Sequence, residues 1–233
     1  MVKKVAILQS NYIPWKGYFD LINKVDEFVL YDDAQYTRRD WRNRNKIKTS
    51  NGLLWLTIPV EVKGKYLQKI NEVKINNDKW ATSHWNSIVH SYRSSPYFTE
   101  YKGIFEALYA NASQENNLSE LNTKFIFAIN DILGIDTQIR SSSEFDLQGD
   151  SSHKLLSMCE EMGATTYLSG PAAKEYLKED LFNSHGVSVE WMDYNDYPEY
   201  PQLYGAYEHN VSIIDVIFNV GAEARKYMKS FSE

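Results

Sequence analysis

The sequence predicts an α/β fold, built on a parallel sheet with a helical middle section. Near both ends of the chain, short apolar runs alternate with segments that have the apolar spacing of helices. Between them, residues 78–133 carry helical spacing in three successive segments and contain no strand pattern. We therefore expect a single α/β domain over residues 1–233, with residues 78–133 as a helical insertion within it.

The opening residues predict a βαβ unit. Residues 5–9 form a compact apolar run, a proline-containing loop follows at 10–15, and residues 17–25 have the spacing of a helix. A second apolar run, typical of a buried strand, ends in Asp32 and Asp33. Ligands of open parallel sheets bind at the carboxyl ends of the strands. We therefore expect the first loop and both carboxylates to lie together in a Rossmann-like core.

The remaining elements follow from the same two periodicities. A turn is predicted at residues 63–65, and further strands over 53–60, 69–75, 137–141, 166–169 and 187–192. Helices are predicted over residues 78–91, 101–108, 118–133, 152–162, 172–184 and 212–218, with a tail helix from Ala222.

Composition limits the classes of function. The formal net charge of −6 argues against sequence-independent binding of nucleic acid, which depends on clustered Lys and Arg. The single cysteine, Cys159, can form no internal disulfide and suits a reducing compartment. The first residues do not fit a signal peptide, and no stretch is long and apolar enough to span a bilayer. We expect a cytoplasmic protein with neither nucleic acid nor membrane as a partner, and leave open whether it forms a homo-oligomer.

Residues 35–48 form a polar, basic segment with the strongest functional signal in the chain. The segment also contains amide side chains. Gln35 lies at its start, and Asn43 and Asn45 alternate with arginines. Guanidinium groups form bidentate contacts with phosphate and carboxylate, so the segment indicates a site for an anionic small molecule. A solvated basic loop is the alternative interpretation. The six cations, which lie within eleven residues, are Arg38, Arg39, Arg42, Arg44, Lys46 and Lys48.

The first loop adds a second set of candidates. Gln9, Asn11, Tyr12 and Trp15 place amide and aromatic groups just before a helix. The N–H groups at a helix start favour an anion, and Gly17 would permit its close approach. Tyr and Trp rings also suit recognition of sugars or bases, although core packing accounts for most aromatic residues of such a chain.

Acid–base candidates are scattered. Asp32 and Asp33 can hold a magnesium ion, orient a ribose or act as a base, or they can cap a turn or pair with Arg. His84 lies in a Trp-rich helix, and His209 precedes the last predicted apolar helix. The sequence contains no histidine pair with zinc spacing, no Gly-x-Ser-x-Gly elbow, no phosphate-binding P-loop and no dinucleotide fingerprint. We predict no metal site from histidines.

Seven ordered segments carry a recognisable residue pattern, at residues 9–19, 31–36, 41–48, 55–60, 84–85, 167–171 and 212–215. Together they resemble the WbqC-like family of bacterial proteins, over essentially the whole chain. Members are commonly encoded among genes for O-antigen and other surface polysaccharides, which implies work on activated sugars in lipopolysaccharide biosynthesis. Many relatives have His-Gln-Pro where this chain has Leu8-Gln9-Ser10, so no role of that histidine carries over.

A second resemblance concerns the first loop. Residues 13–19 follow a strand and open a helix, and in this they are similar to the H-x-G-H loop of nucleotidylyltransferases and pantothenate-synthetase-like enzymes. Trp15 and Tyr18 stand where those enzymes have histidines. The resemblance implies a nucleotidylyltransferase-like core that binds nucleotide, but not the adenylyl-transfer chemistry.

We expect a transferase that attaches an acyl or aminoacyl group to the amine of a nucleotide-linked sugar. One of Asp33, His84 and His209 would remove the proton, and an acyl donor, or ATP with magnesium, would be the cosubstrate. One alternative is an ATP-dependent nucleotidylyltransferase or ligase with Asp32 on magnesium, and another is a non-catalytic sugar-binding or assembly factor. The expected binding residues are Gln9, Asn11, Tyr12, Trp15, Gln35, Arg42, Asn43, Arg44, Asn45 and Ser169.

Overall fold

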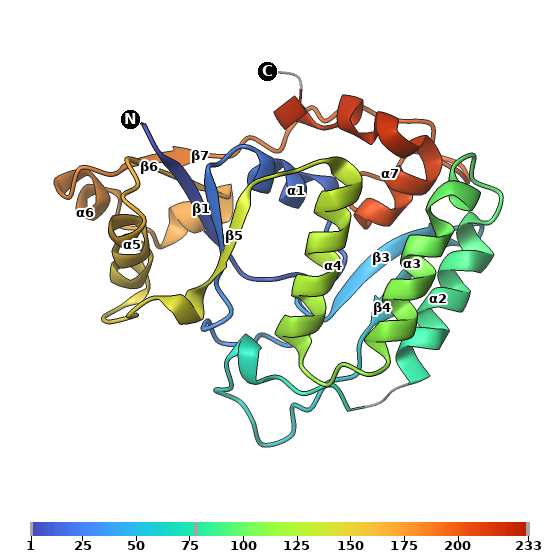
Figure 1. Ribbon diagram of the computed structural model, residues 1–233, viewed down its shortest axis with the longest axis horizontal. Coiled ribbons are helices and arrows are strands. Elements are labelled where there is room, and N and C mark those ends of the chain that lie inside the picture. The colour runs from blue at the N-terminus through green and yellow to red at the C-terminus, as the bar shows by residue number, and fades with distance from the viewer. Residues whose placement is uncertain (1, 77–78, 232–233) are drawn as a thin grey trace.

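A five-stranded parallel sheet forms the centre of the computed structural model, which describes residues 2–76 and 79–231 (Figure 1). The strand order is β5-β2-β1-β6-β7, and every neighbouring pair is parallel. This confirms the predicted α/β class with a parallel sheet. The strands are β1 (Lys4–Leu8), β2 (Glu27–Leu30), β5 (Gln138–Ser141), β6 (Thr166–Ser169) and β7 (Ser188–Trp191).

The strand order creates a topological switch point. From β1 the chain moves outward through β2 to β5, and then returns to the other side of β1 for β6 and β7. Connections therefore leave β1 and β6 in opposite directions, which opens a crevice beyond their carboxyl ends. Leu8 and Ser169 are the last residues of these two strands. The loops that follow them are the first place to look for a ligand site.

Both faces of the sheet are buried, which explains the continuous apolar runs of its strands. Within β1, Ala6 packs in the larger core cluster, while Val5 and Ile7 pack in the smaller one. The larger cluster contains side chains of α1, α4 and α7, and the smaller contains those of α5 and α6. The helices are α1 (Lys16–Asn23), α2 (Lys79–Tyr92), α3 (Phe98–Ala112), α4 (Leu118–Leu133), α5 (Ser151–Glu161), α6 (Glu179–Ser184) and α7 (Ile213–Val220).

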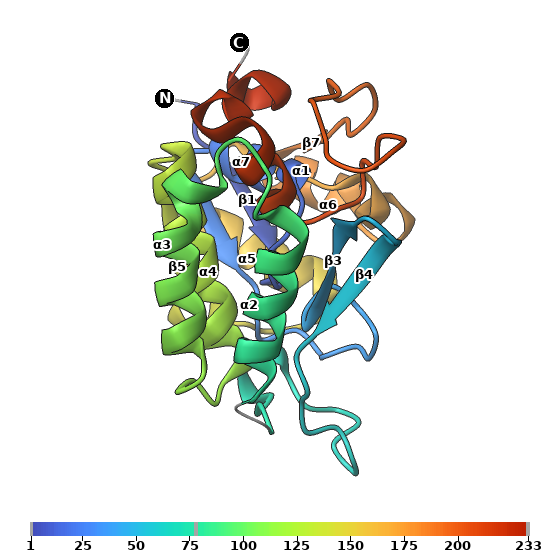
Figure 2. The ribbon, with the colours of Figure 1, turned by 90° about the vertical axis from the view of Figure 1, so that its right-hand side faces the viewer.

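Three helices, α2, α3 and α4, form the predicted helical middle section and stand side by side in both ribbon views (Figures 1 and 2). Helix α4 has the bounds expected from its apolar spacing. Asn117 caps its start by accepting from the N–H groups of Ser119 and Glu120. Gly134 ends it with a φ of 61°, a left-handed conformation that glycine adopts without strain.

A separate antiparallel hairpin, β3 (Arg44–Thr49) and β4 (Gly52–Thr57), packs beside α2. The sequence predicted β4, although three residues too long, and it did not predict β3. Ile47 and Leu56 point inward and are almost completely buried. Lys46 and Trp55 are paired across the two strands and point outward. The second half of the basic segment is therefore a strand rather than a loop.

Three other predictions of local structure are wrong. The expected strand at 69–75 is a 3₁₀ turn, η1 (Ile70–Glu72), flanked by isolated bridges. The expected helix at 172–184 is η3 (Pro171–Glu175) and α6, because Leu177 between them turns into the core cluster with α5. The tail is not an α-helix but two 3₁₀ segments, η4 (Gly221–Tyr227) and η5 (Lys229–Phe231). The remaining 3₁₀ turn is η2 (Ser142–Glu144).

The predicted start of the first middle helix at residue 78 lies outside the described residues. Within the described ranges, no helix combines the length and the apolar composition needed to cross a bilayer.

Gly17 has a different role from the one expected. A Cβ added at this position would lie 2.3 Å from the Trp15 indole, so the ring already occupies the space next to the glycine. Close packing of the indole, rather than approach of an anion, is what requires glycine here.

We expect Gly17→Ala to destabilise the protein by about 1–3 kcal/mol through overpacking, which corresponds to a fall of roughly 5 °C in Tm. Differential scanning calorimetry measures it. Gly103→Ala is the matched control, because a Cβ there meets nothing within 4 Å and α3 gains helix propensity. Equal Tm values for Gly17→Ala and the unchanged protein would show that the indole does not need this contact.

Candidate active site at the switch point

An arginine from the basic segment reaches the carboxyl end of β1. The guanidinium of Arg42 donates through Nη2 to the Gln9 side chain at 3.0 Å and through Nη1 to the side-chain oxygen of Asn11. Only 14% of the Arg42 side chain is exposed. Its nearest carboxylate is that of Asp40, at 3.7 Å. Both hydrogen-bond acceptors are neutral amides, and only the longer ion pair with Asp40 offsets the positive charge, so the guanidinium can still attract an anionic ligand.

The backbone on both sides of Arg42 is fixed by neighbouring elements. The N–H of Tyr12 donates to the carbonyl of Trp41 at 3.0 Å. The amide of Asn122, fully buried in α4, donates to the Arg42 carbonyl at 2.9 Å and to the Ser10 hydroxyl at 3.1 Å. The first loop, the basic segment and the middle section thus hold the guanidinium in one position.

The β6 side of the crevice carries hydroxyl groups. Burial raises the pKa of the Tyr176 phenol, and the charge of Arg42 acts on the same phenol in the opposite direction. The loop after β6 therefore lies within electrostatic range of Arg42 at the end of β1. Ser169 is buried at the end of β6, and its hydroxyl donates to the Tyr167 hydroxyl at 3.3 Å. Tyr176 is 57% exposed and remains open to a ligand.

A cavity of about 250 Å³ lies beside this arginine. Asn11, which binds Arg42, forms part of its wall. Two indoles and three amides dominate the lining, a combination that suits one flat or cyclic group with polar substituents. The lining residues are Asn11, Pro14, Trp15, Trp41, Asn45 and Asn210.

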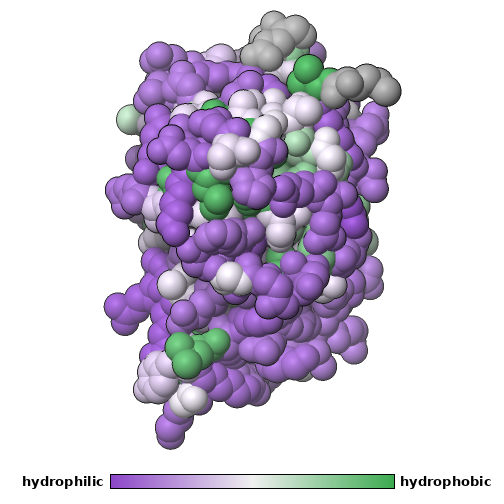
Figure 3. All heavy atoms as spheres, turned by 90° about the vertical axis from the view of Figure 1, so that its left-hand side faces the viewer, coloured by the Kyte–Doolittle hydropathy of each residue, from purple (hydrophilic) through white to green (hydrophobic). Residues whose placement is uncertain are grey.

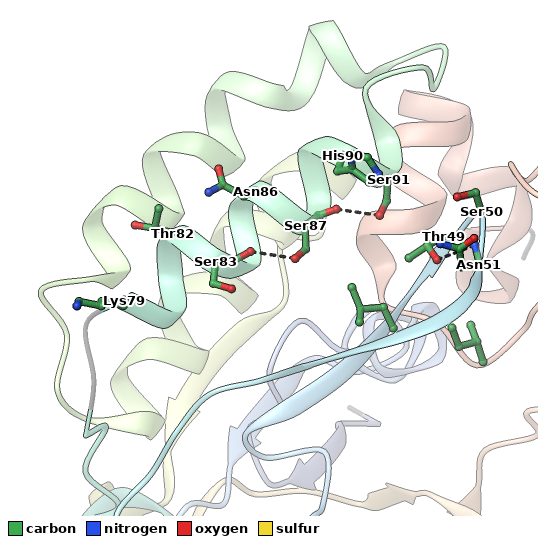
Figure 4. A pocket seen from close by; sticks show the side chains of 12 residues that line it. Thr49, Ser50, Asn51, Lys79, Thr82, Ser83, Asn86, Ser87, His90 and Ser91 are labelled. Atoms are coloured by element: carbon green, nitrogen blue, oxygen red, sulfur yellow. Dashed lines mark hydrogen bonds between the residues drawn. The ribbon is translucent and has the colours of Figure 1, made fainter.

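A wider groove of about 890 Å³ lies between the hairpin and α2 (Figure 4). None of the predicted site residues lines it. The Ser87 and Ser91 hydroxyls donate to carbonyl oxygens one helical turn earlier, at 3.0 and 2.8 Å. Because these hydroxyls are already engaged by the helix itself, the groove offers fewer free polar groups than its lining suggests.

The two aspartates after β2 have separate partners. Asp32 is almost fully buried and accepts from the Ser10 N–H at 2.8 Å and from the Ser119 hydroxyl. Asp33 forms an ion pair with Lys69 at 2.9 Å and accepts from Ser142 at 2.8 Å. Burial raises the pKa of Asp33, but Lys69 and Ser142 outweigh it and lower the pKa overall, which weakens it as a base. In residues 2–76 and 79–231, no three metal-binding side chains converge on one point.

His84 and Tyr12 lie together in the core, away from solvent. The Tyr12 hydroxyl is 2.9 Å from His84 Nδ1 and 2.6 Å from the Tyr109 hydroxyl. Tyr12 is 0% exposed and His84 is 6% exposed. Burial lowers the pKa of His84 to about 4, although a backbone contact at Thr57 acts slightly against it. These residues anchor the first loop and face no cavity large enough for a ligand among those described above.

His209 is the third acid–base candidate and lies in the loop that closes the small cavity. Its neighbour Asn210 lines that cavity. The imidazole packs edge-on against Tyr207 with centroids 4.6 Å apart, and its Nε2 is 3.9 Å from Glu199. With 47% of its side chain exposed, it can exchange protons with solvent.

Two buried charges hold this C-terminal loop. Lys16 donates to the Pro198 carbonyl at 2.8 Å among tyrosine rings, and burial lowers its pKa to about 8. Asp215 accepts from the hydroxyls of Tyr92 and Tyr200, each at 2.7 Å. Burial raises the pKa of Asp215 despite these donors. Through these hydrogen bonds, the two side chains fix where the loop with His209 and Asn210 lies.

Of the remaining candidates, three serve the hairpin. The amide of Asn43 donates to the Ile58 carbonyl at 2.8 Å, and that of Asn45 to the Ile13 carbonyl at 2.9 Å. The Arg44 guanidinium lies 4.1 Å from the centroid of Trp55. Gln35 lies on an exposed segment and donates to the Tyr66 carbonyl at 2.8 Å.

The structure thus brings Gln9, Asn11, Trp15, Arg42 and Asn45 together and leaves the other candidates elsewhere. It also adds two residues that were not proposed from the sequence, Asn210 and Tyr176. Neither carries a sequence signal, because both lie in irregular segments outside any motif. Trp41 was noted as part of the basic segment but not as a wall of the cavity.

Comparison with known proteins gives one family. The sequence pattern of the WbqC-like protein family matches residues 9–227. The chain belongs to this family. A Mycobacterium tuberculosis protein named Uncharacterized protein Rv1507c is 48% identical over 228 residues, covering 98% of both chains. No solved structure matches the chain.

This WbqC-like protein carries backbone strain in its first loop. Ile13 has a φ of 38°, a left-handed conformation that a β-branched residue rarely adopts. The amide of Asn45 fixes its carbonyl, and the N–H of Ile213 donates to the next carbonyl, that of Pro14, at 2.9 Å. Such strain persists only where surrounding contacts outweigh it, and it clusters at ligand sites. It is an independent reason to place the site at this loop.

We expect the buried, neutral His84 to make the protein sensitive to acid. Its pKa is about 4 when folded and 6.5 for an ordinary histidine, so the unfolded chain binds the proton first as pH falls below 6.5. The free energy of unfolding should therefore drop between pH 6.5 and 4, by roughly 3 kcal/mol in all. The measurement is urea unfolding at pH 7 and at pH 5. Between these two pH values, the free energy of unfolding of the unchanged protein should fall by about 2 kcal/mol more than that of His84→Gln.

The control for this measurement is His90→Gln, which changes an exposed histidine on the same helix. It should retain the full pH dependence. If His84→Gln and the unchanged protein lose stability in parallel, then His84 is not held neutral by burial.

Proposed function

We propose that the protein is a transferase that acts on a nucleotide-linked sugar in surface-polysaccharide biosynthesis, and attaches an acyl or aminoacyl group to a sugar amine. One observation carries the proposal. The Arg42 guanidinium is held by Gln9 and Asn11 at the switch point, next to a cavity walled by Trp15 and Trp41. In this proposal phosphate binds Arg42 and the sugar ring enters the cavity.

Size and chemistry support this division of the ligand. A volume of about 250 Å³ lies below the range of ~300–1,000 Å³ typical of pockets for whole drug-sized molecules. It suits a single ring, so the nucleotide would lie outside, along Arg42. The indoles can pack against the apolar face of a sugar, while the amides of Asn11 and Asn210 bond its substituents. The amide of Asn45 already bonds to backbone groups and contributes only to the shape of the wall.

The reaction requires an activated donor, for which we propose an acyl thioester. The sugar amine attacks the thioester carbonyl, a carbon–nitrogen bond forms, and the carbon–sulfur bond breaks. The amine proton passes to a base and the thiolate leaves. Among the three acid–base candidates, we propose His209 as this base, because its neighbour Asn210 lines the cavity, while His84 is buried and Asp33 is ion-paired.

The proposal is tested by incubating the protein with nucleoside diphosphate amino sugars and acyl thioesters. We expect a product heavier by one acyl group, with release of one free thiol per turnover, detected by mass spectrometry and a thiol reagent. His209→Gln should lower kcat by at least about a hundredfold. His153→Gln, on exposed α5, should leave it unchanged. Absence of a mass change with every pair of substrates would rule out this reaction.

Binding is tested separately with a nucleoside diphosphate sugar in calorimetry. We expect Arg42→Lys to raise Kd by about tenfold or more, because lysine cannot keep both amide contacts and a bidentate phosphate contact. Arg93→Lys, at an exposed position just after α2, is the matched control and should bind normally. A Kd unaffected by Arg42→Lys would move the phosphate site away from the switch point.

A further inference from the structure

Exposed apolar side chains are concentrated on one stretch of the described chain. Ten large hydrophobic side chains are at least 40% exposed, and six of them fall within residues 41–67. By contrast, the face around α5 and α6 is mainly hydrophilic, and apolar side chains appear on it only in small separate patches (Figure 3). The six are Trp41, Leu53, Leu54, Trp55, Tyr66 and Leu67, the last two being 72% and 82% exposed. Exposed apolar side chains gathered in this way mark an interaction surface.

Positive charge is concentrated on the same stretch. Residues 35–69 contain nine Lys and Arg against two Asp and Glu, a net of +7 in a chain whose net charge is −6. Some of these cations are neutralised locally, such as Lys65 by Glu61 at 2.6 Å. Six others have no ion-pair partner among the described residues. Lys48 is buried, and the remaining five are Arg38, Arg39, Arg44, Lys46 and Lys63.

Ring contacts join these side chains into one surface. On the outer side of the hairpin, the Trp41 and Trp55 rings are 5.5 Å apart, and Lys46 lies 5.5 Å from the Trp55 centroid. Arg38 lies 5.3 Å from the Tyr66 centroid and donates to the Val62 carbonyl at 2.7 Å. The short segment from Arg38 to Trp41 therefore connects the loop of residues 60–69 with the hairpin. Figure 2 shows this loop projecting from the end of β4. Leu54 is paired with Ile47 and lies on the inner side of the hairpin, in the groove beside α2. We call the other five apolar side chains and the five cationic side chains the cationic face.

We propose that the cationic face docks onto an anionic lipid surface. Cations beside Trp and Tyr rings suit the headgroup region, where lysine and arginine bind anionic lipids and indoles lie at the apolar boundary. The exposed leucines decide between classes of partner. A nucleic acid or an anionic glycan would use the cations and the rings, but it has no use for the exposed Leu53 and Leu67, whereas lipid chains do.

This inference does not depend on the proposed function, and it adds something the sequence could not show. Lack of a membrane-spanning segment led us to expect no membrane partner, but peripheral docking requires only exposed side chains. Trp41 belongs both to the cationic face and to the wall of the small cavity. Docking would therefore bring the candidate site close to the lipid surface.

The test is sedimentation with vesicles of phosphatidylcholine alone and with vesicles that also contain phosphatidylglycerol. We expect the protein to pellet only with the anionic vesicles, and less at high salt. Lys46→Gln should weaken vesicle binding about fivefold, and Leu67→Ser about tenfold. The matched controls, Lys102→Gln on α3 and Phe127→Ser on α4, remove the same kinds of exposed side chain elsewhere and should bind normally.

Several outcomes would overturn the proposal. The proposal is wrong if the protein does not pellet with anionic vesicles. It is also wrong if the control variants lose as much vesicle binding as Lys46→Gln and Leu67→Ser. Binding to heparin or RNA without binding to vesicles would assign the cationic face to a polyanion instead. Acyl transfer to a soluble sugar substrate should be unchanged in Leu67→Ser. A failure of the vesicle-binding proposal can therefore be distinguished from a failure of the proposed function.

Discussion

The buried carboxylate of Asp32 is the contact on which the arrangement of the site depends. It lies just after β2, accepts from the Ser10 N–H just after β1, and accepts from the Ser119 hydroxyl at the start of α4. Three elements far apart in the sequence thus meet at one charge in the core. A buried carboxylate left without these donors would be strongly destabilising, so the first loop has little freedom to move. The position of Gln9, and through it of Arg42, follows from this contact.

The centre of the sheet could be predicted because its three inner strands, β2, β1 and β6, are buried on both faces. Such strands give short unbroken apolar runs, and the predicted strand at 166–169 has the same bounds as β6. Strand β3 could not be found in this way. Its outward residues include Arg44 and Lys46, and Asn45 points inward only because it bonds to the carbonyls of Tyr12 and Ile13. A strand whose burial depends on a distant loop has no local periodicity to detect.

The candidate site, like the fold, could be predicted only in part from the sequence. A basic segment near the first loop was predictable, because cations cluster visibly in an acidic chain. Which of its side chains face the ligand was not. Arg42 turns toward the crevice while Arg44 packs on Trp55, and Asn43 serves the backbone of the hairpin. His84 was likewise indistinguishable from a catalytic histidine, since the same helical position can face a cavity or the core. Only tertiary packing separates these outcomes.

The charge distribution also bears on how the molecule would meet a surface. Residues 35–69 have a net charge of +7 and the whole chain has a net charge of −6, so the rest of the chain has a net charge of −13. An anionic surface therefore attracts one segment and repels the remainder, which selects an orientation as well as an affinity. The attraction is screened within about 10 Å at 0.1 M salt, so charge alone brings the protein near, and the exposed Trp55 and Leu67 would decide whether it stays. In that orientation Trp41, shared by the cationic face and the cavity, lies between the surface and the arginine that we propose binds phosphate.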